Sequence, residues 1–253
     1  MPDQDPSIAM PFDFDRKKIA QELWLPQTKN DLMESNRLGA DLFRKLNSEI
    51  VTGKKLEAGS WIFLAGFLAK SLGHDNGLSV GDLKGFKIAD IGGGHYSPPS
   101  SFGPNLARAL AYLGAEVFVV DPKASNSDFA EDSFAIGSVS VVPKWAQELY
   151  EENDGPISSD RPVDIVTSSA FVASPGSPND SEYPSLLDGL RKISNVQIHL
   201  IQINDAVFLG ENGIIQNIRK NVDGVKYCAD VSAKLGSDST ETDFIVIDSR
   251  FKK

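Results

Sequence analysis

A run of three glycines after a short apolar segment is the first feature of this 253-residue chain that points to chemistry. The run Gly92-Gly93-Gly94 begins two residues after Asp90, and a helix-like stretch starts near residue 105. Glycines let a ligand approach the backbone closely, and backbone N–H groups gathered near the start of a helix favour an anionic group. This segment is therefore the first candidate for a ligand cradle.

An acidic residue also closes the next apolar run. Asp121 follows residues 116–120 directly, and Pro122 comes after it. If both runs are neighbouring parallel strands, their carboxyl ends lie at one edge of a sheet. A carboxylate at that edge is placed to accept the hydroxyl protons of a ribose. The two segments together predict a site for a cofactor that carries a ribose.

This arrangement resembles the class I S-adenosylmethionine (SAM)-dependent methyltransferase superfamily, whose first motif is an acidic residue followed by a glycine-rich loop. The resemblance covers residues 86–251. It implies that Asp90 is the first-motif acid, that the glycines face the methionine part of SAM and that Asp121 holds the ribose. It further implies that the residues after the fourth strand line the pocket. The implied cofactor-binding residues are Asp90, Gly92, Gly93, Gly94, Asp121, Pro122, Ser168, Ser169 and Ala170.

Two departures from the family pattern concern the loop and the adenine. Residues 95–102 stand where the family places its third glycine, and no acidic residue closes the third expected strand, so adenine recognition has no assigned residue. A nicotinamide-binding Rossmann domain is the main competing interpretation. Its fingerprint requires a glycine three residues beyond Gly94, and that position is Ser97. The dinucleotide pattern therefore fails.

After residue 85, short apolar runs alternate with helix-like stretches, which is typical of βαβ units and a mainly parallel sheet. We expect strands at 86–91, 116–120, around 135–142, 163–167 and 196–203, and helices at 105–113, 144–152, 183–193 and 213–221. The final runs, 225–233 and 243–247, are too close for a helical crossover and should pair antiparallel. The expected fold is α/β: a seven-stranded, mostly parallel, Rossmann-like methyltransferase sheet with an antiparallel last strand.

The first 85 residues are expected to form a helical cap or lid, and residues 86–253 the SAM-binding domain. Between residues 28 and 53, Leu38, Leu42, Leu46 and Ile50 recur every four residues among charged ones, which predicts a solvated helix with one buried stripe. The apolar run 61–72 is shorter than the roughly 20 residues that span a membrane. Both segments should therefore dock on the sheet.

Composition narrows the function classes. The chain is 41% hydrophobic and 24% charged, with a formal net charge of −10. An acidic protein lacks the basic face that neutralises phosphates, so a nucleic-acid substrate is not expected. The single cysteine, Cys228, and the absence of a secretory pattern favour the cytoplasm. The histidines show no metal-ligand spacing, and we expect no metal. The expected partner is a small-molecule substrate, without membrane association; a homodimer is left open.

Methyl transfer from SAM is an in-line displacement, so the protein mainly aligns the nucleophile, excludes water and stabilises the cation. Aromatic faces attract a sulfonium by roughly 0.5–2 kcal/mol. No triad or paired-carboxylate motif is required. Ser168-Ser169-Ala170 replaces the Asn-Pro-Pro-Tyr sequence associated with amino-group methylation of nucleobases and glutamine, which favours a small-molecule acceptor. The candidate catalytic residues are His95, Tyr96, Phe171, Tyr183 and Asn204.

Two other functions use the same fold. In the first, the amine of SAM attacks the carbon beside its sulfonium, forming azetidine-2-carboxylate and releasing methylthioadenosine. Azetidine-2-carboxylate synthases are methyltransferase-like proteins of this kind, and an enclosed pocket of Tyr96, Phe171, Tyr183 and Asn204 would suit the reaction. In the second, the protein binds SAM or a partner without catalysis.

Overall fold

The computed structural model describes residues 23–51, 54–93, 104–151, 155–173, 182–203, 214–230, 241–248 and 250. Its helices are α2 (Lys29–Lys45), the π-helical turn η1 (Leu46–Ile50), α3 (Trp61–Ser71), α4 (Asn105–Tyr112), the 3₁₀ turn η2 (Asn126–Phe129), α5 (Glu148–Glu151), α6 (Glu182–Leu190) and α7 (Ile214–Asn221). Its strands are β1 (Lys87–Ile91), β2 (Glu116–Val120), β3 (Ser138–Val142), β4 (Ile165–Ala173), β5 (Val196–Ile203), β6 (Val225–Asp230) and β7 (Glu241–Asp248).

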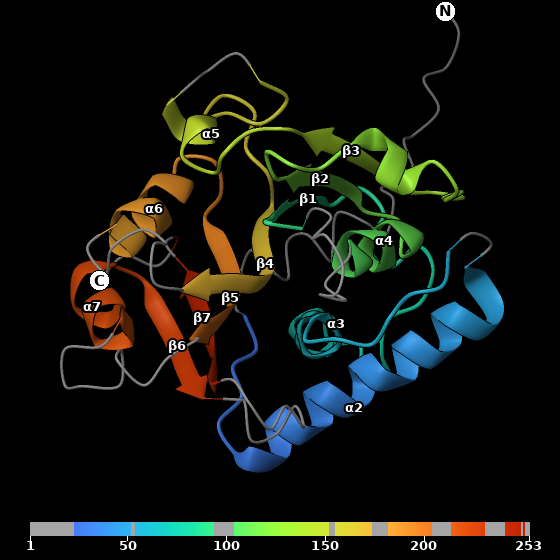
Figure 1. Ribbon diagram of the computed structural model, residues 1–253. Coiled ribbons are helices and arrows are strands. Elements are labelled where there is room, and N and C mark those ends of the chain that lie inside the picture. The colour runs from blue at the N-terminus through green and yellow to red at the C-terminus, as the bar shows by residue number, and fades with distance from the viewer. Residues whose placement is uncertain are drawn as a thin grey trace, which may run out of the picture.

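The seven strands form one sheet in the order β3-β2-β1-β4-β5-β7-β6 (Figure 1). The first five strands in this order are parallel, whereas β7 is antiparallel to both β5 and β6. This topology confirms the expected fold class, including the antiparallel pairing of the last two strands. The crossovers between parallel strands bring their carboxyl ends to one edge of the sheet, where ligands of open α/β folds bind.

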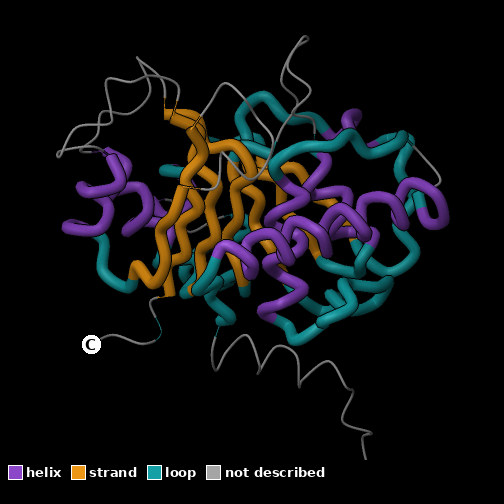
Figure 2. The backbone as a smooth tube through the Cα atoms, turned by 90° about the horizontal axis from the view of Figure 1, so that it is seen from below, coloured by secondary structure: helices purple, strands orange, loops and turns teal. Residues whose placement is uncertain are grey.

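Alternate residues of β1, β2 and β4 enter two different hydrophobic cores. Ile88 packs in the core shared with α2, α3 and α4, whereas its neighbour Ala89 packs in the core shared with α5 and α6. Val119 and Val120 divide in the same way on β2. Figure 2 shows the strands side by side with the long helix α2 crossing one side of them. The unbroken apolar stretch of residues 117–120 in β2 follows from burial on both faces.

The helices before β1 form a layer of the first core. Thr28 and Asp31 make a capping box that starts α2, and Leu32, Leu38 and Leu42 form its buried stripe. α2 crosses α3 so closely at Gly39 that a Cβ on this residue would collide with the Ile62 carbonyl oxygen. α3 in turn packs on the sheet.

Aromatic rings join α3 to β7. The rings of Phe63 and Phe67 lie 4.9 and 4.8 Å from that of Phe244, both edge-on. Such edge-to-face pairs add stability beyond the area that they bury. The described part of residues 1–85 is therefore built into the core. The division of the chain at residue 85, and the movement of the first part as a lid, stay predictions.

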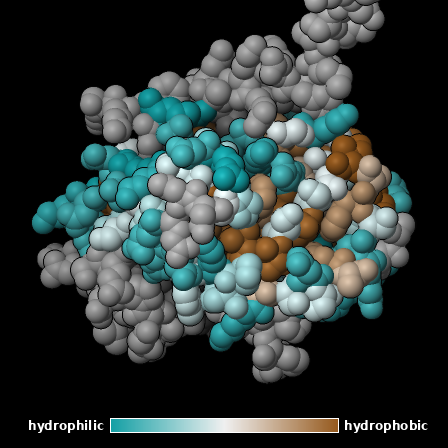
Figure 3. Space-filling view, turned by 90° about the horizontal axis from the view of Figure 1, so that it is seen from above, coloured by the Kyte–Doolittle hydropathy of each residue, from teal (hydrophilic) through white to brown (hydrophobic). Residues whose placement is uncertain are grey.

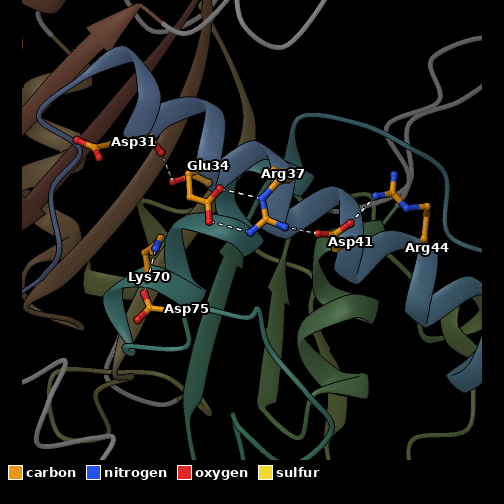
Figure 4. Close-up of polar contacts among 8 residues, drawn as sticks. Asp31, Glu34, Arg37, Asp41, Arg44, Lys70 and Asp75 are labelled. Atoms are coloured by element: carbon orange, nitrogen blue, oxygen red, sulfur yellow. Dashed lines mark hydrogen bonds and ion pairs between the residues drawn. The ribbon is translucent and has the colours of Figure 1, made fainter.

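The outer face of α2 is charged, as the sequence pattern predicts. Arg37 lies between Glu34 and Asp41, with N–O distances of 2.8 and 2.7 Å, and Arg44 also contacts Asp41 (Figure 4). Exposed pairs of this kind contribute at most about 1 kcal/mol each. They keep this face of the helix in water rather than hold the fold together.

Three sequence expectations differ from the structure. β4 runs to Ala173, whereas residues 163–167 were expected, so Ser168, Ser169 and Ala170 lie within the strand and not after it. α5 has four residues instead of the expected helix 144–152. The helix expected from residue 28 to 53 is α-helical only to Lys45, because η1 then widens the turn. Other described boundaries lie within a few residues of those expected.

Candidate cofactor site

Asp90 lies near the carboxyl end of β1, in register with Val119 of β2 and Thr167 of β4. Its side chain is buried, with 1% of the residue exposed. The Thr167 hydroxyl lies 3.3 Å from Asp90 Oδ1, and Oδ2 has no hydrogen-bond partner within the described part of the chain. A buried carboxylate oxygen without a donor is rare in native proteins. The geometry therefore leaves a place for a donor or a cation beside Oδ2.

The protonation of Asp90 reflects this environment. The pKa of the Asp90 carboxyl is raised to about 7, chiefly by burial; the hydrogen bond from Thr167 lowers it, and the negative charge of Asp121 contributes a smaller increase. Burial penalises the charged form because the low dielectric of the interior solvates it poorly. A cationic or donating ligand group beside Oδ2 would favour the ionised form.

The turn after β1 depends on two glycines. Gly92 has φ of 70°, in the left-handed region that side chains disfavour, and its N–H donates to the Val120 carbonyl at 2.9 Å. A Cβ on Gly93 would collide with Asp90 Oδ2. The backbone therefore passes directly over the buried carboxylate. Gly94, His95 and Tyr96 lie outside the described residues.

Asp121 stands at the end of β2, beside the Asp90 turn. It is 8% exposed, its Oδ1 accepts the Lys123 N–H at 2.8 Å, and its own N–H donates to the Val142 carbonyl at 3.3 Å. These bonds fix the orientation of the carboxylate, which has further lone pairs available for a ligand hydroxyl. Pro122 follows it and is half-buried. The structure thus brings the two predicted carboxylates to one edge of the sheet.

The carboxyl end of β4 projects beyond the end of β1. The last β1 residue that pairs with β4 is Asp90, opposite Thr167, whereas β4 continues alongside β5 to Ala173. A bulge separates the pairs Ser168–His199 and Phe171–Ile201. Ser168 is buried, and its predicted neighbours Ser169 and Ala170 fall in the bulge itself. This projecting segment borders the glycine turn.

The remaining candidate catalytic residues stay predictions. Phe171 lies in β4 and Tyr183 in α6, but both side chains lie outside the described part of the structure. Asn204 follows β5 and also lies outside it. The assigned roles of all these residues, and those of the cofactor-binding set, are untested.

Trp145 is a residue of this edge that the sequence interpretation left without a role. It follows the carboxyl end of β3 by three residues and is 61% exposed, and its backbone N–H donates to a carboxylate oxygen of Glu148. The Val142 carbonyl that receives the Asp121 N–H places the end of β3 beside Asp121. The sequence shows a tryptophan after the third strand, but only the structure shows that its side chain is exposed.

The rest of the described surface offers weaker sites. Figure 3 shows a mainly polar face with a limited apolar patch, and the exposed large apolar residues of the described chain include Met33, Val80 and Ile136 besides Trp145. A depression of about 330 Å³ between α6 and α7 is lined by Pro184, Ser185, Asp188, Asn217 and Asn221. It contains none of the residues named above. Within the described ranges there is no group of three or more potential metal ligands.

None of the described helices combines the length and the apolar composition needed to cross a membrane.

The strand order and the reversed β7 define the Rossmann-like fold of class I SAM-dependent methyltransferases. No protein-family model and no curated protein sequence matches the chain. Among the solved structures with a similar fold are three that align with this chain over most of their own length.

The magnesium protoporphyrin IX methyltransferase of Synechocystis PCC 6803, solved with bound SAM, is 14% identical with a TM-score of 0.42, covering 93% of this chain and 91% of its own. A protein of Thermoplasma acidophilum is 14% identical with a TM-score of 0.43, covering 86% and 99%. An rRNA methylase of Streptococcus thermophilus is 12% identical with a TM-score of 0.41, covering 66% and 89%. These low values carry no inference about activity, and the fold assignment rests on the strand order.

Proposed function

We propose that this protein is a SAM-dependent transferase that acts on a small molecule at the carboxyl edge of β1, β2 and β4. The observation that carries the proposal is the pair of buried carboxylates, Asp90 and Asp121, at the ends of adjacent parallel strands. The glycine turn between them passes so close to Asp90 that any side chain on Gly93 would collide with its carboxylate. The residues present therefore fit a cofactor with a ribose and a cationic amino-acid group.

Each described residue has a defined task in this proposal. Asp121 accepts the ribose hydroxyls, and Asp90 orders the glycine turn and compensates positive charge near Oδ2. Gly92 permits the left-handed turn after β1, and Gly93 lets the backbone approach the ligand closely. Bound SAM would supply a methyl group activated by its sulfonium. The protein needs only to position the acceptor and exclude water, so no general base is required of the described residues.

The acceptor is proposed to be a small molecule because the chain is acidic, with a formal net charge of −10. Long-range repulsion disfavours polyanionic substrates such as nucleic acids. A reducing cytoplasm fits a chain with one cysteine. These finer statements extend beyond the fold and need direct tests.

Calorimetric titration with S-adenosylhomocysteine tests the site, and product analysis tests the reaction. The purified protein is incubated with SAM alone and with pools of small acceptors, and the products are followed by mass spectrometry. S-adenosylhomocysteine formed only when an acceptor is present supports methyl transfer. Absence of both binding and turnover would remove the proposal.

The same assay addresses the cyclisation hypothesis. Methylthioadenosine and a cyclic amino acid formed from SAM alone would establish that reaction instead. No described contact favours it over methyl transfer, because the side chains invoked for an enclosed pocket lie outside the described residues. Binding of S-adenosylhomocysteine without any turnover would favour a non-catalytic protein.

A further inference from the structure

A series of hydrogen-bonded, buried polar side chains links Ser168, in the middle of β4, to helix α6. Ser168 Oγ lies 2.9 Å from His199 Nδ1, His199 Nε2 lies 3.1 Å from Gln197 Oε1, and Gln197 Nε2 donates to the Leu187 carbonyl at 2.8 Å. The three polar residues are at most 1% exposed. None of them is explained by the packing of apolar side chains around it.

The direction of each hydrogen bond in this series follows from the bond between Gln197 and Leu187. The side-chain amide N–H of Gln197 donates to the Leu187 carbonyl, so its Oε1 faces His199 and can only accept a hydrogen bond. His199 therefore carries its proton on Nε2. Burial lowers the pKa of His199 to about 3, so the ring is neutral and Nδ1 has a lone pair. The Ser168 hydroxyl consequently donates to Nδ1.

At the other end of the series, Ser168 lies where β4 changes register. Ser168 and His199 are the last cross-strand pair before the bulge, and Phe171 pairs with Ile201 after it. Two residues of β4 thus oppose the single residue Leu200 of β5. Because side chains alternate along a strand, a slip of one residue would exchange the faces of all later positions. Bulges of this kind commonly re-aim side chains beside active sites.

The segment after the bulge is also the part of β4 that has left β1. Residues 171–173 pair with β5 on one side, residues 169 and 170 form the bulge, and the β1 pairing ends at Thr167. Their position therefore depends on β5 and on the interaction that fixes the strand register at Ser168. The Ser168–His199 hydrogen bond is placed to fix this register. Through Gln197 it also ties that register to a carbonyl near the end of α6.

We propose that Ser168, His199 and Gln197 are positioning residues that hold residues 169–173 of β4 in the register required for cofactor binding. This inference rests on the proposed function, since it assigns a ligand to the edge that these residues border. His199 is not a proton acceptor for substrate in this arrangement. Its ring transmits the fixed orientation of Gln197 to the Ser168 hydroxyl.

The test compares two buried serines, one beside the bulge of β4 and one just before the start of β5. Ser168→Ala breaks the series of hydrogen bonds beside the bulge. Ser194→Ala is the matched control, because Ser194 is 3% exposed, accepts the Val196 N–H at 3.2 Å and contacts the Asp164 carbonyl at 3.2 Å, near the amino ends of β4 and β5. Affinity for S-adenosylhomocysteine is measured by calorimetry, and stability by thermal unfolding.

We expect both variants to lose similar stability, but only Ser168→Ala to weaken binding, by about tenfold, as one buried hydrogen bond allows. Gln197→Met, nearly isosteric and far from the ligand edge, should weaken binding in the same direction and serves if Ser168→Ala does not fold. Imidazole nitrogen NMR should show the Nε2–H tautomer of His199, with an Nδ1 shift that changes on ligand binding and in Ser168→Ala.

Equal affinities in the wild type, Ser168→Ala and Gln197→Met, with an unchanged His199 signal on binding, would overturn the positioning role and leave the proposed function intact. Equal losses of affinity in Ser168→Ala and Ser194→Ala would also overturn it, since the effect would then be general destabilisation. A wild-type protein that does not bind S-adenosylhomocysteine would instead overturn the proposed function, and this inference with it.

Discussion

At the level of single residues, two opposing effects act on the protonation state of Asp90. Its burial favours the neutral acid, whereas a cationic ligand group would favour the carboxylate. The raised pKa of about 7 exceeds the ordinary value of 3.8, so the folded protein binds this proton more tightly than the unfolded chain does. The free energy of unfolding therefore falls as pH rises from about 4 to about 7, and the Asp90 contribution is constant above that range.

Asp90→Asn should remove this penalty. We expect the variant to gain stability relative to the wild type as pH rises, by roughly 4 kcal/mol at most at pH 8, while losing affinity for S-adenosylhomocysteine. Urea unfolding at about pH 5 and about pH 8 measures the difference. Parallel pH profiles of the two proteins would show that Asp90 is already ionised and paired in the free protein.

Asp121→Ala should affect the ligand rather than the fold. We expect a loss of about 1–3 kcal/mol in binding, because ribose hydroxyls would be left without their acceptor. Calorimetry with S-adenosylhomocysteine provides the measurement. Asp75→Ala is the control, since it removes a carboxylate from the exposed Lys70 pair. Unchanged affinity in folded Asp121→Ala would end the assignment of the ribose site.

At the scale of elements, we expect the loop after β3 to supply the contact for the adenine that the sequence leaves unassigned. We expect Trp145 to stack on the base, because it is exposed at the edge beside Asp121 and base–aromatic stacking contributes about 1–3 kcal/mol. Trp145→Ala should weaken binding, Trp145→Phe should largely retain it, and ligand should quench wild-type tryptophan fluorescence more strongly than that of Trp145→Phe. Identical affinity in all three proteins would place the adenine elsewhere.

The elements also show which information the sequence contains. β1 and β2 were predictable because short, mainly apolar runs lead to Asp90 and Asp121, and the last two strands because the loop between them is too short for a helix. β4 was not, since Ser168 and Ser169 resemble the polar start of a loop. Their place in the strand depends on His199, which is 31 residues away in the chain and contacts Ser168 only after folding.

At the scale of the whole molecule, the core of α2, α3 and α4 continues into the sheet. A lid that opened as one piece would have to separate Phe63 and Phe67 from Phe244. We therefore expect the amides of α3 to exchange as slowly as those of β1 without ligand, with equal further slowing of both when ligand binds, as global stabilisation requires.

Hydrogen exchange with and without S-adenosylhomocysteine measures these rates directly. Fast exchange of α3 in the free protein, with selective slowing by ligand, would reveal local opening and support a lid. Equal protection of α3 and β1 in both states would identify α3 as a permanent layer of the fold.

The inserted position of β7 has a consequence for synthesis on the ribosome. β7 lies between β5 and β6, so a nascent chain that ends before residue 241 leaves β5 without a partner on one side and β6 without the partner it has in the described sheet. Unpaired strand edges template aggregation. Translational pausing between β6 and β7 should therefore increase the demand for chaperones, whereas a pause before β6 would expose one strand fewer.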